Sequence, residues 1–406
     1  MFPEDKHNKI FISYAKTVYD QREIDAVNEC LLKSTQMGSY SRIFEKKIAE
    51  IFDKNHCLYV NSGSSALYLA IEACNFVSGS QVITPALTFS TTVGCLIKNN
   101  LIPAFVDVEP TSYCIDVNKI EGMINEKTVA ILAPNLMGNI CDWKKIREIA
   151  NKYNLIVIED SADTIGASLN NKSTGSYTDI SITSFYGSHI INCAGNGGAV
   201  AFNNKDFYKK AKLLRSWGRS SSLFDENSET IENRFNVELD GIEYDAKFVF
   251  EEIGYNLEGS EIGASFGLVQ LDKLKENIKI RQKNFLRQTN FFSKFNQFFT
   301  VPEENSKCKT AWLAYPILIK NEAPFSRKEF QIYLEKNNIQ TRVVFTGNIL
   351  RQPMCRDIHK IVNKNGYENS DNVMKFGVLL PVHHGMTEQM FEKFFYIIEL
   401  FIEKYK

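Results

Sequence analysis

The segment Asn61-Ser62-Gly63-Ser64-Ser65 combines residue types that can bind a phosphate group. It follows the apolar run CLYV and opens the helical pattern ALYLAIEAC. Backbone N–H groups at the start of a helix have no partner inside the helix, so together with serine hydroxyls they can hold an anion. Serine and glycine are also ordinary helix-capping residues. Taken alone, the segment is more typical of a cap than of a phosphate site.

A carboxylate, Asp160, stands at the end of the apolar run LIVIED. At the carboxyl edge of a strand, such a group could pair with a protonated pyridine nitrogen and keep the ring electron-poor. Glu159 beside it should point to the opposite face, because side chains alternate along a strand. A lone aspartate after a strand is more often a helix cap, so this position also needs support from its neighbours.

The run SFYGSH at residues 184–189 ends on His189, and a glycine pair follows at positions 197 and 198. Imidazole has an unperturbed pKa of about 6.5, which suits a general base near neutral pH. The alternative is a histidine in a site that binds a cofactor without turnover. The first two groups favour the catalytic interpretation, because a site without catalysis has little reason to keep a phosphate-binding segment and a pyridine partner.

The elements that must position these residues alternate between about residues 55 and 205. Helical patterns separate short β-rich runs, which are QVITPA, IPAFVDV, VAILAPNL, LIVIED, DISITSF and GAVAF. This alternation predicts an α/β fold whose mainly parallel sheet is flanked by helices on both faces. Ligands of such sheets bind beyond the carboxyl ends of the strands, so residues that directly follow these runs are the candidates for a site.

The rest of the chain predicts an excursion, a long helix and a smaller lobe. Residues 216–258 are polar and weakly periodic, which is typical of a surface excursion or an inter-subunit arm. The stretch that starts EIGASF has apolar residues at intervals of three and four, and predicts a long helix. We expect a large cofactor-binding domain over residues 1–265 and a long helix with a small α+β domain over residues 266–406, with strands at WLAYPILI and TRVVF.

Composition excludes several classes of protein. The 47 basic and 48 acidic side chains nearly cancel, which argues against a nucleic-acid partner. No stretch approaches the about 20 apolar residues that span a bilayer, and the start MFPEDKHNKI lacks the apolar core of a signal peptide. We therefore expect a soluble, cytoplasmic protein with no membrane partner. Nine scattered cysteines without a C-x-x-C pair argue against disulfides and against a metal site, and are expected to be reduced and mostly buried.

The chain carries, in order, the phosphate cradle of residues 61–65, an aromatic residue, the strand-end aspartate, the motif S-F-x-x-x-[K/H] and the glycine pair. This order resembles the DegT/DnrJ/StrS family of nucleotide-sugar aminotransferases. The resemblance covers nearly the whole chain, from Phe44-Glu45 through the FVDV and GYN motifs to Thr341-Arg342 and Gln352-Pro353. It implies a fold type I, aspartate-aminotransferase-like structure that uses pyridoxal 5'-phosphate or pyridoxamine 5'-phosphate.

The same resemblance implies roles for individual residues. Asp160 looks like the pyridine partner, Phe89 of ITPALTF like the ring-stacking aromatic, and Asn256 like an asparagine that reaches the phosphate from the neighbouring subunit. A homodimer with shared active sites is therefore implied. The residues that look like phosphate ligands are Gly63, Ser64, Ser65 and Ser184.

At His189 the sequence departs from most of the family, which has a lysine there because an amine must form the covalent link to the cofactor. Lysine-to-histidine exchange marks the branch of nucleotide-linked 4-keto-6-deoxyhexose 3-dehydratases of the colitose-pathway type. Three further features resemble this branch: Asn-Ser-Gly-Ser-Ser in the cradle, Gly-Tyr-Asn-Leu at residues 254–257, and Asp163, in a cofactor-binding slot that is usually glutamine or histidine. In this branch the histidine acts as the base and the cofactor works in its amine form.

The implied reaction removes the 3-hydroxyl of a GDP- or CDP-linked 4-keto-6-deoxy sugar in 3,6-dideoxysugar biosynthesis for lipopolysaccharide or capsule. An iron–sulfur cluster would want about four cysteines. The residues after Trp217-Gly218-Arg219 are serines, and no cysteine occurs between Cys193 and Cys308. We therefore expect glutamate, and not a reductase partner, to regenerate the amine form. An aminotransferase that works without lysine and a non-catalytic cofactor-binding relative remain the alternatives.

Three residues are candidates for contacts with the substrate. Arg219 and Arg342 could clamp a diphosphate or a carboxylate, because guanidinium binds such groups through two parallel hydrogen bonds. An exposed ion pair is the alternative for either. His383 lies in Pro-Val-His-His-Gly, near where the family contacts its substrate, although His383 and His384 also fit an ordinary surface loop.

Overall fold

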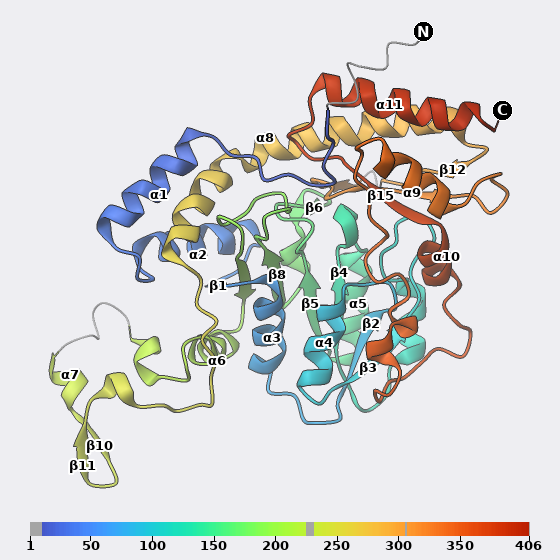
Figure 1. The fold of residues 1–406 in the computed structure, drawn as a ribbon. Helices are drawn as coiled ribbons and strands as arrows, with labels where there is room; N and C mark the ends of the chain where they lie inside the picture. Colours follow the sequence, from blue (N-terminus) through green and yellow to red (C-terminus); the bar gives the residue numbers. More distant parts are fainter. Residues whose placement is uncertain (1–9, 225–230, 305–306, 406) are drawn as a thin grey trace.

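The predicted β-rich runs form one seven-stranded sheet in the computed structural model, which describes residues 10–224, 231–304 and 307–405 (Figure 1). The strand order is β1-β9-β8-β5-β4-β2-β3. Pairing is parallel from β3 to β8, whereas β9 runs antiparallel to both β8 and β1. The predicted mainly parallel sheet is confirmed. Its strands are β1 (His56–Val60), β2 (Gln81–Pro85), β3 (Ile102–Val106), β4 (Thr128–Pro134), β5 (Ile156–Asp160), β8 (Ile180–Ser184) and β9 (Gly198–Phe202).

Helices cover both faces of this sheet, because strands that are apolar on both sides must be buried on both sides. One face packs against α3 (Gly63–Ala73), α4 (Ser90–Lys98) and α6 (Lys205–Arg215). The other face packs against α2 (Ser39–Ile51) and α5 (Trp143–Tyr153). Figure 1 shows α3 and α4 in front of the strands, with the amino end of α3 directed toward the upper edge of the sheet.

The predicted long helix is α8 (Glu261–Phe292), which has 32 residues. Ser260 caps it by accepting a hydrogen bond from the N–H of Gly263. Its first half contacts α2 and also α1 (Gln21–Lys33), which begins with an Asp20/Glu23 capping box. Its second half reaches the C-terminal lobe, so α8 connects the two parts of the chain (Figure 1).

The C-terminal lobe has an antiparallel sheet of three strands in the order β12-β14-β15. The predicted strand at WLAYPILI is confirmed as β14. The predicted strand at TRVVF is wrong: Arg342 forms only an isolated bridge with Leu379, and Phe345 has a positive φ of 43° that turns the chain out of an extended path. The elements of the lobe are β12 (Phe299–Thr300), β14 (Tyr315–Ile319), β15 (Gly377–Leu380), α9 (Arg327–Lys336), α10 (Glu368–Phe376) and α11 (Glu388–Glu403).

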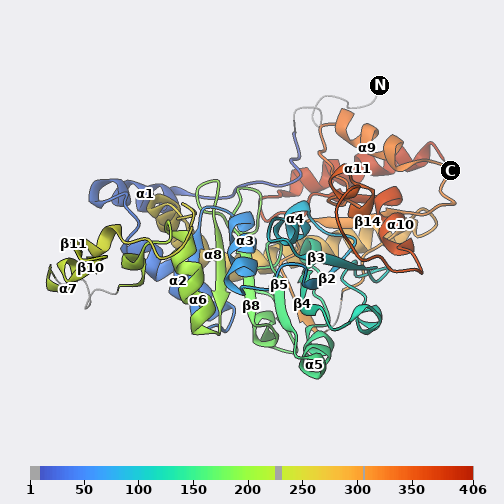
Figure 2. The same ribbon diagram turned by 90° about the horizontal axis from the view of Figure 1, so that it is seen from below.

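The predicted excursion projects from the large sheet, at the opposite end of the molecule from the C-terminal lobe (Figures 1 and 2). It contains α7 (Ile231–Phe235) and a hairpin of β10 (Val237–Leu239) and β11 (Ile242–Tyr244). Residues 225–230 of the predicted excursion lie outside the described residues. A separate small sheet, in the order β13-β6-β7, is made of β6 (Ser168–Leu169), β7 (Lys172–Ser173) and β13 (Cys308–Lys309).

Two further expectations concern the cysteines and membrane-spanning helices. Eight of the nine cysteines are buried and Cys74 is partly buried, as predicted. Among the helices of the described ranges, none is long and apolar enough to cross a bilayer.

Candidate active site

A cavity of about 310 Å³ opens at the carboxyl ends of β5 and β8 and the amino end of α3. Its volume falls in the range of small-molecule and cofactor sites. The cavity brings together the three groups that the sequence singles out. It is lined by Ser62, Gly63, Ser64, Leu67, Phe89, Thr91, Pro134, Leu136, Asp160, Ala162, Asp163, Ile182, Ser184, Tyr186, His189, Asn196, Gly197 and Phe345.

The amino end of α3 forms one wall of the cavity. Ser62 caps the helix by accepting a hydrogen bond from the N–H of Ser65 at 3.1 Å. A Cβ atom at Gly63 would lie 2.6 Å from Cβ of Ser184, so the close approach of helix and strand requires glycine there. Gly63, Ser64 and Ser184 line the cavity, but the hydroxyl of Ser65 donates to Asn61 Oδ1 at 2.6 Å and lies outside the lining. This wall offers amides and hydroxyls to a phosphate.

Asp160 forms a second wall at the end of β5. It is only 6% exposed, and its carboxylate accepts hydrogen bonds from Thr92 Oγ1 and from the N–H of Ala162, both at 3.1 Å. Burial raises the pKa of Asp160 to about 6, because the ionised form loses water. A cationic partner, such as a protonated ring nitrogen, would restore the ionised form. Glu159 lies on the opposite face, where it accepts from Ser181 at 2.6 Å.

Asp163 lines the cavity beside Asp160. Its Oδ2 atom accepts a hydrogen bond from the N–H of Met137 at 2.9 Å. Burial raises the pKa of Asp163 to about 7, and the negative charge of Asp160 acts in the same direction. The two carboxyl groups therefore hold less negative charge at neutral pH than their number implies.

Two aromatic rings form a further wall. Phe89 is 51% exposed, and its ring meets that of Phe345 at a centroid distance of 6.1 Å and an interplanar angle of 81°. An exposed ring over a cavity can stack on a flat ligand. Sequence reasoning missed Phe345 because it comes from the C-terminal lobe, far from the motif-bearing segment. It also missed Thr92, the hydrogen-bond donor to Asp160.

His189 completes the site in an uncharged form with one free acceptor. Its Nδ1 atom lies 3.2 Å from the carbonyl oxygen of Ser184, which can only accept, so Nδ1 carries the hydrogen and Nε2 keeps its lone pair. Burial lowers the pKa of His189 to about 4, and the positive charge of Arg281 acts in the same direction. None of the lining residues, all within the described ranges, is a lysine.

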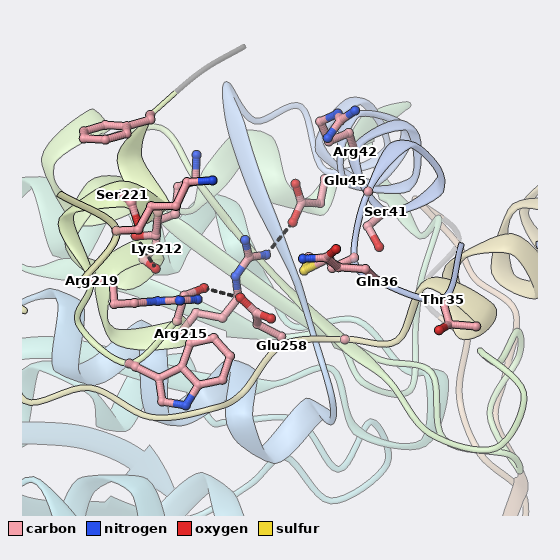
Figure 3. A pocket seen from close by; sticks show the side chains of 18 residues that line it. Thr35, Gln36, Ser41, Arg42, Glu45, Lys212, Arg215, Arg219, Ser221 and Glu258 are labelled. Atoms are coloured by element: carbon pink, nitrogen blue, oxygen red, sulfur yellow. Dashed lines mark hydrogen bonds and ion pairs between the residues drawn. The ribbon is translucent and has the colours of Figure 1, made fainter. Parts of the chain in front are cut away.

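Arg219 and Asn256 lie outside this cavity. Arg219 lines a second, larger cavity of about 1070 Å³ between α2, α6 and residues 216–224 (Figure 3). Its guanidinium carbon lies 4.4 Å from the ring centroid of Trp217. Asn256 is exposed and pairs through its backbone with Ser216, which also lines the second cavity. Neither residue is among those that line the His189 cavity.

Arg342 and His383 also do not line the His189 cavity. The guanidinium carbon of Arg342 lies 5.4 Å from the ring centroid of Tyr14. The surface-loop interpretation of His383 is wrong, because the side chain is fully buried. Its Nε2 atom contacts the carbonyl oxygen of Ser13 at 3.1 Å, and burial lowers its pKa to about 3. The structure thus gives His383 a packing role beneath the N-terminal segment.

The sheet is mainly parallel, and its carboxyl edge carries a helix-start phosphate cradle, a buried aspartate and an aromatic wall. This arrangement is the aspartate-aminotransferase-like fold of the pyridoxal phosphate enzymes. The model of the DegT/DnrJ/EryC1/StrS aminotransferase family matches residues 18–399, and the chain belongs to this family. The predicted family, fold and cofactor, pyridoxal phosphate or its amine form, are confirmed.

Similar proteins have different activities. The lipopolysaccharide biosynthesis protein RfbH of Salmonella typhimurium is 33% identical over 90% of this chain and 85% of its own length. GDP-perosamine synthase of Caulobacter vibrioides is 28% identical over 93% and 94%. A solved structure of GDP-4-keto-6-deoxymannose-3-dehydratase with a trapped PLP-glutamate geminal diamine has a TM-score of 0.84 and 26% identity, over 95% of this chain and 99% of that one. Similarity alone therefore does not separate dehydration from amino transfer.

Proposed function

We propose that this chain is a 3-dehydratase of a GDP- or CDP-linked 4-keto-6-deoxy sugar, and that it serves 3,6-dideoxysugar biosynthesis for a surface polysaccharide. The observation that carries the proposal is His189, an uncharged imidazole in a cofactor cavity whose lining residues include no lysine. An aminotransferase of this family needs an amine at that position to link to the cofactor and to release its product.

The cofactor in its amine form supplies a nitrogen that joins the sugar's C4 ketone and a ring that accepts electrons. The chain's own residues would hold this group by three kinds of contact. The helix-start amides with Ser64 and Ser184 would bind the phosphate, Asp160 would keep a proton on the ring nitrogen, and Phe89 would stack on the ring. The raised pKa of Asp160 fits this role, because a buried carboxyl gains most from a buried cation.

His189 would accept the proton that must leave the carbon bearing the cofactor's amine. Its Nε2 atom is the acceptor, because Nδ1 already donates to Ser184. A base that is uncharged at neutral pH needs no prior loss of a proton. The cavity lining has no lysine that could displace the bound substrate. Elimination of the C3 hydroxyl would therefore not compete with release of the substrate by such a lysine.

The proposed reaction balances with glutamate as the only co-reactant. Glutamate supplies two electrons and two hydrogens and becomes 2-oxoglutarate, while its nitrogen leaves as ammonia. The sugar loses the oxygen at C3 and becomes the 3-deoxy-4-keto sugar; the water formed at C3 is consumed when the nitrogen is released. A relative's structure with a PLP-glutamate adduct supports glutamate as the donor.

The residues outside the cavity fit roles across a homodimer. We propose that Asn256 reaches the phosphate of the neighbouring subunit, since it is exposed on the projecting segment and lies outside the cavity of its own chain. Arg219 belongs to the same segment and could clamp the substrate's diphosphate there. Arg342 stays a candidate clamp for a carboxylate or diphosphate at the lobe.

The test follows the cofactor and then the sugar. Purified protein with pyridoxal phosphate and glutamate should convert the aldehyde absorption to that of the amine form. Addition of GDP- or CDP-linked 4-keto-6-deoxyhexose should then release ammonia and yield a 3-deoxy sugar. The alternative, amino transfer, has support from the perosamine synthase relative, and an amino sugar product would establish it in place of dehydration.

A further inference from the structure

The loop that carries His189 joins β8 to β9 over residues 185–197 and contains no helix or strand. Its two arms are tied to each other by backbone hydrogen bonds from Phe185 N to Gly197 O and from Gly187 N to Gly195 O, both at 2.9 Å. These bonds do not attach the loop to the rest of the molecule. The position of the imidazole therefore depends on contacts that the loop makes with other segments.

The N-terminal segment supplies one such contact. Thr17 donates a hydrogen bond from Oγ1 to the carbonyl oxygen of Gly187 at 2.5 Å, two residues before His189. A Cβ atom at Gly187 would lie 3.4 Å from Thr17 Oγ1, at ordinary van der Waals distance, so the hydroxyl lies directly against this arm of the loop. Thr17 is distant in sequence, and its hydroxyl holds the near arm of the loop.

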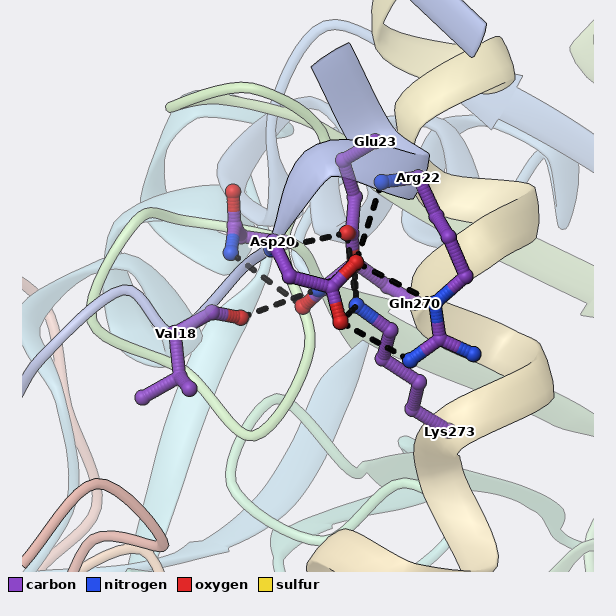
Figure 4. A network of polar contacts seen from close by, with 7 residues as sticks. Val18, Asp20, Arg22, Glu23, Gln270 and Lys273 are labelled. Atoms are coloured by element: carbon purple, nitrogen blue, oxygen red, sulfur yellow. Dashed lines mark hydrogen bonds and ion pairs between the residues drawn. The ribbon is translucent and has the colours of Figure 1, made fainter. Parts of the chain in front are cut away.

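A single amide of α8 supplies the second contact. Gln270 is fully enclosed, and its Nε2 atom donates to Val18 O at 3.0 Å and to Glu23 Oε1 at 2.6 Å (Figure 4). Its Oε1 atom lies 3.5 Å from Nδ2 of Asn192, three residues after His189. The amide of Gln270 therefore joins the far arm of the loop to the N-terminal segment.

The orientation of this amide is fixed by a buried ion pair. Glu23 is fully buried, and Lys273 Nζ lies 2.6 Å from both of its carboxylate oxygens (Figure 4). A buried carboxylate without these donors would cost several kcal/mol, so the network has one favourable arrangement. The same helix touches the loop directly, because a Cβ atom at Gly267 would lie 2.7 Å from Sγ of Cys193. Helix α8 is thus a rigid base for the loop.

We propose that Thr17 and Gln270 are positioning residues, which hold the two arms of the His189 loop so that the imidazole keeps its hydrogen on Nδ1 and its lone pair on Nε2. The inference rests on the proposed function only in that His189 is the base. Misplacement of a base by about 1 Å can cost about a hundredfold in rate, so a partial loss of positioning should cost about tenfold.

The test compares Thr17→Val, which removes the donor and keeps the shape, with Thr17→Ser, which keeps the donor. Thr111→Val is the matched control, because Thr111 is only partly buried, donates a solvent-exposed hydrogen bond to Glu303 at 2.9 Å and does not line the cavity. We expect Thr17→Val to lower kcat of dehydration about tenfold with KM for the sugar unchanged, and Thr17→Ser and Thr111→Val to stay within about twofold of the wild type. A wild-type kcat in Thr17→Val would overturn the proposal.

A second readout needs no cofactor and no turnover. The ring ¹⁵N signals of His189, assigned by their loss in His189→Asn, report which nitrogen carries the hydrogen. We expect one form in the wild type, with hydrogen on Nδ1, and a mixture in Thr17→Val and in Gln270→Met. Unchanged ring signals in Thr17→Val would overturn the positioning role even if Gln270→Met failed to fold. If His189→Asn still dehydrates the sugar, the proposed function fails, while the ring signals still test the positioning.

Discussion

Replacement of Asp160 by asparagine tests the cofactor-binding geometry, because it removes the charge and keeps the shape. Burial raises the pKa of Asp160 from its ordinary value near 4 to about 6, so without a cationic partner the site disfavours the ionised form by about 3 kcal/mol. A protonated ring nitrogen within hydrogen-bond reach offsets this cost. Asparagine cannot make that charged contact, so we expect the affinity for pyridoxal phosphate to fall about a hundredfold, which corresponds to about 3 kcal/mol.

The assay is a titration of cofactor-free protein with pyridoxal phosphate between pH 5 and 8. Below pH 6 the wild type should bind progressively more weakly, because Asp160 becomes protonated, whereas Asp160→Asn should show no such dependence from this position. Asp357→Asn, an exposed aspartate of the C-terminal lobe, is the matched control and should bind like the wild type. Binding by Asp160→Asn within twofold of the wild type at pH 7.5 would refute the assignment of Asp160 as the ring partner.

Two further predictions concern stability. The folded-state pKa of Asp163 is raised to about 7, above its value near 4 in the unfolded chain. The contribution of Asp163 to the free energy of unfolding is therefore fully favourable below pH 4 and is lost as the pH rises through 7. Asp163→Asn should stabilise the cofactor-free protein at pH 8 by at most about 4 kcal/mol and hardly at all at pH 4, measured by denaturant unfolding. An Asp163→Asn effect that does not change with pH would contradict this. Gly63→Ala should destabilise the protein by about 1–3 kcal/mol and weaken phosphate binding, because its Cβ would meet Ser184 at 2.6 Å. Gly122→Ala, whose Cβ would meet nothing within 4 Å, should leave the unfolding midpoint and the cofactor affinity unchanged, and equal effects of the two variants would rule out the clash.

The cavity could be predicted from the sequence where its residues directly follow strands. Asp160 and Ser184 end β5 and β8, and Gly63 opens the helix after β1, so local patterns placed all three at one edge of the sheet. Phe345 could not be found in this way, because it reaches the cavity from another lobe through a turn with positive φ. The run TRVVF has strand-forming residues, yet its backbone makes only one bridge.

The sequence also did not predict which side chains become buried where segments distant in the chain pack together. The pair His383-His384 resembles a polar loop by composition, but it lies beneath the N-terminal segment and beside Arg281 of α8. Thr17 and Gln270 belong to no motif. Their contacts with the His189 loop depend on how residues 13–20, the loop and α8 pack together in the fold.

The fate of the donor nitrogen tests the dehydratase proposal most directly. The protein would be incubated with pyridoxal phosphate, ¹⁵N-labelled glutamate and the GDP- or CDP-linked 4-keto-6-deoxy sugar, beside the His189→Asn variant, and the label would be followed by mass spectrometry. We predict that the wild type releases the label as ammonia in equal amount to a nitrogen-free 3-deoxy sugar, and that His189→Asn forms neither. Label in the sugar, with the oxygen at C3 retained, would contradict dehydration and establish amino transfer.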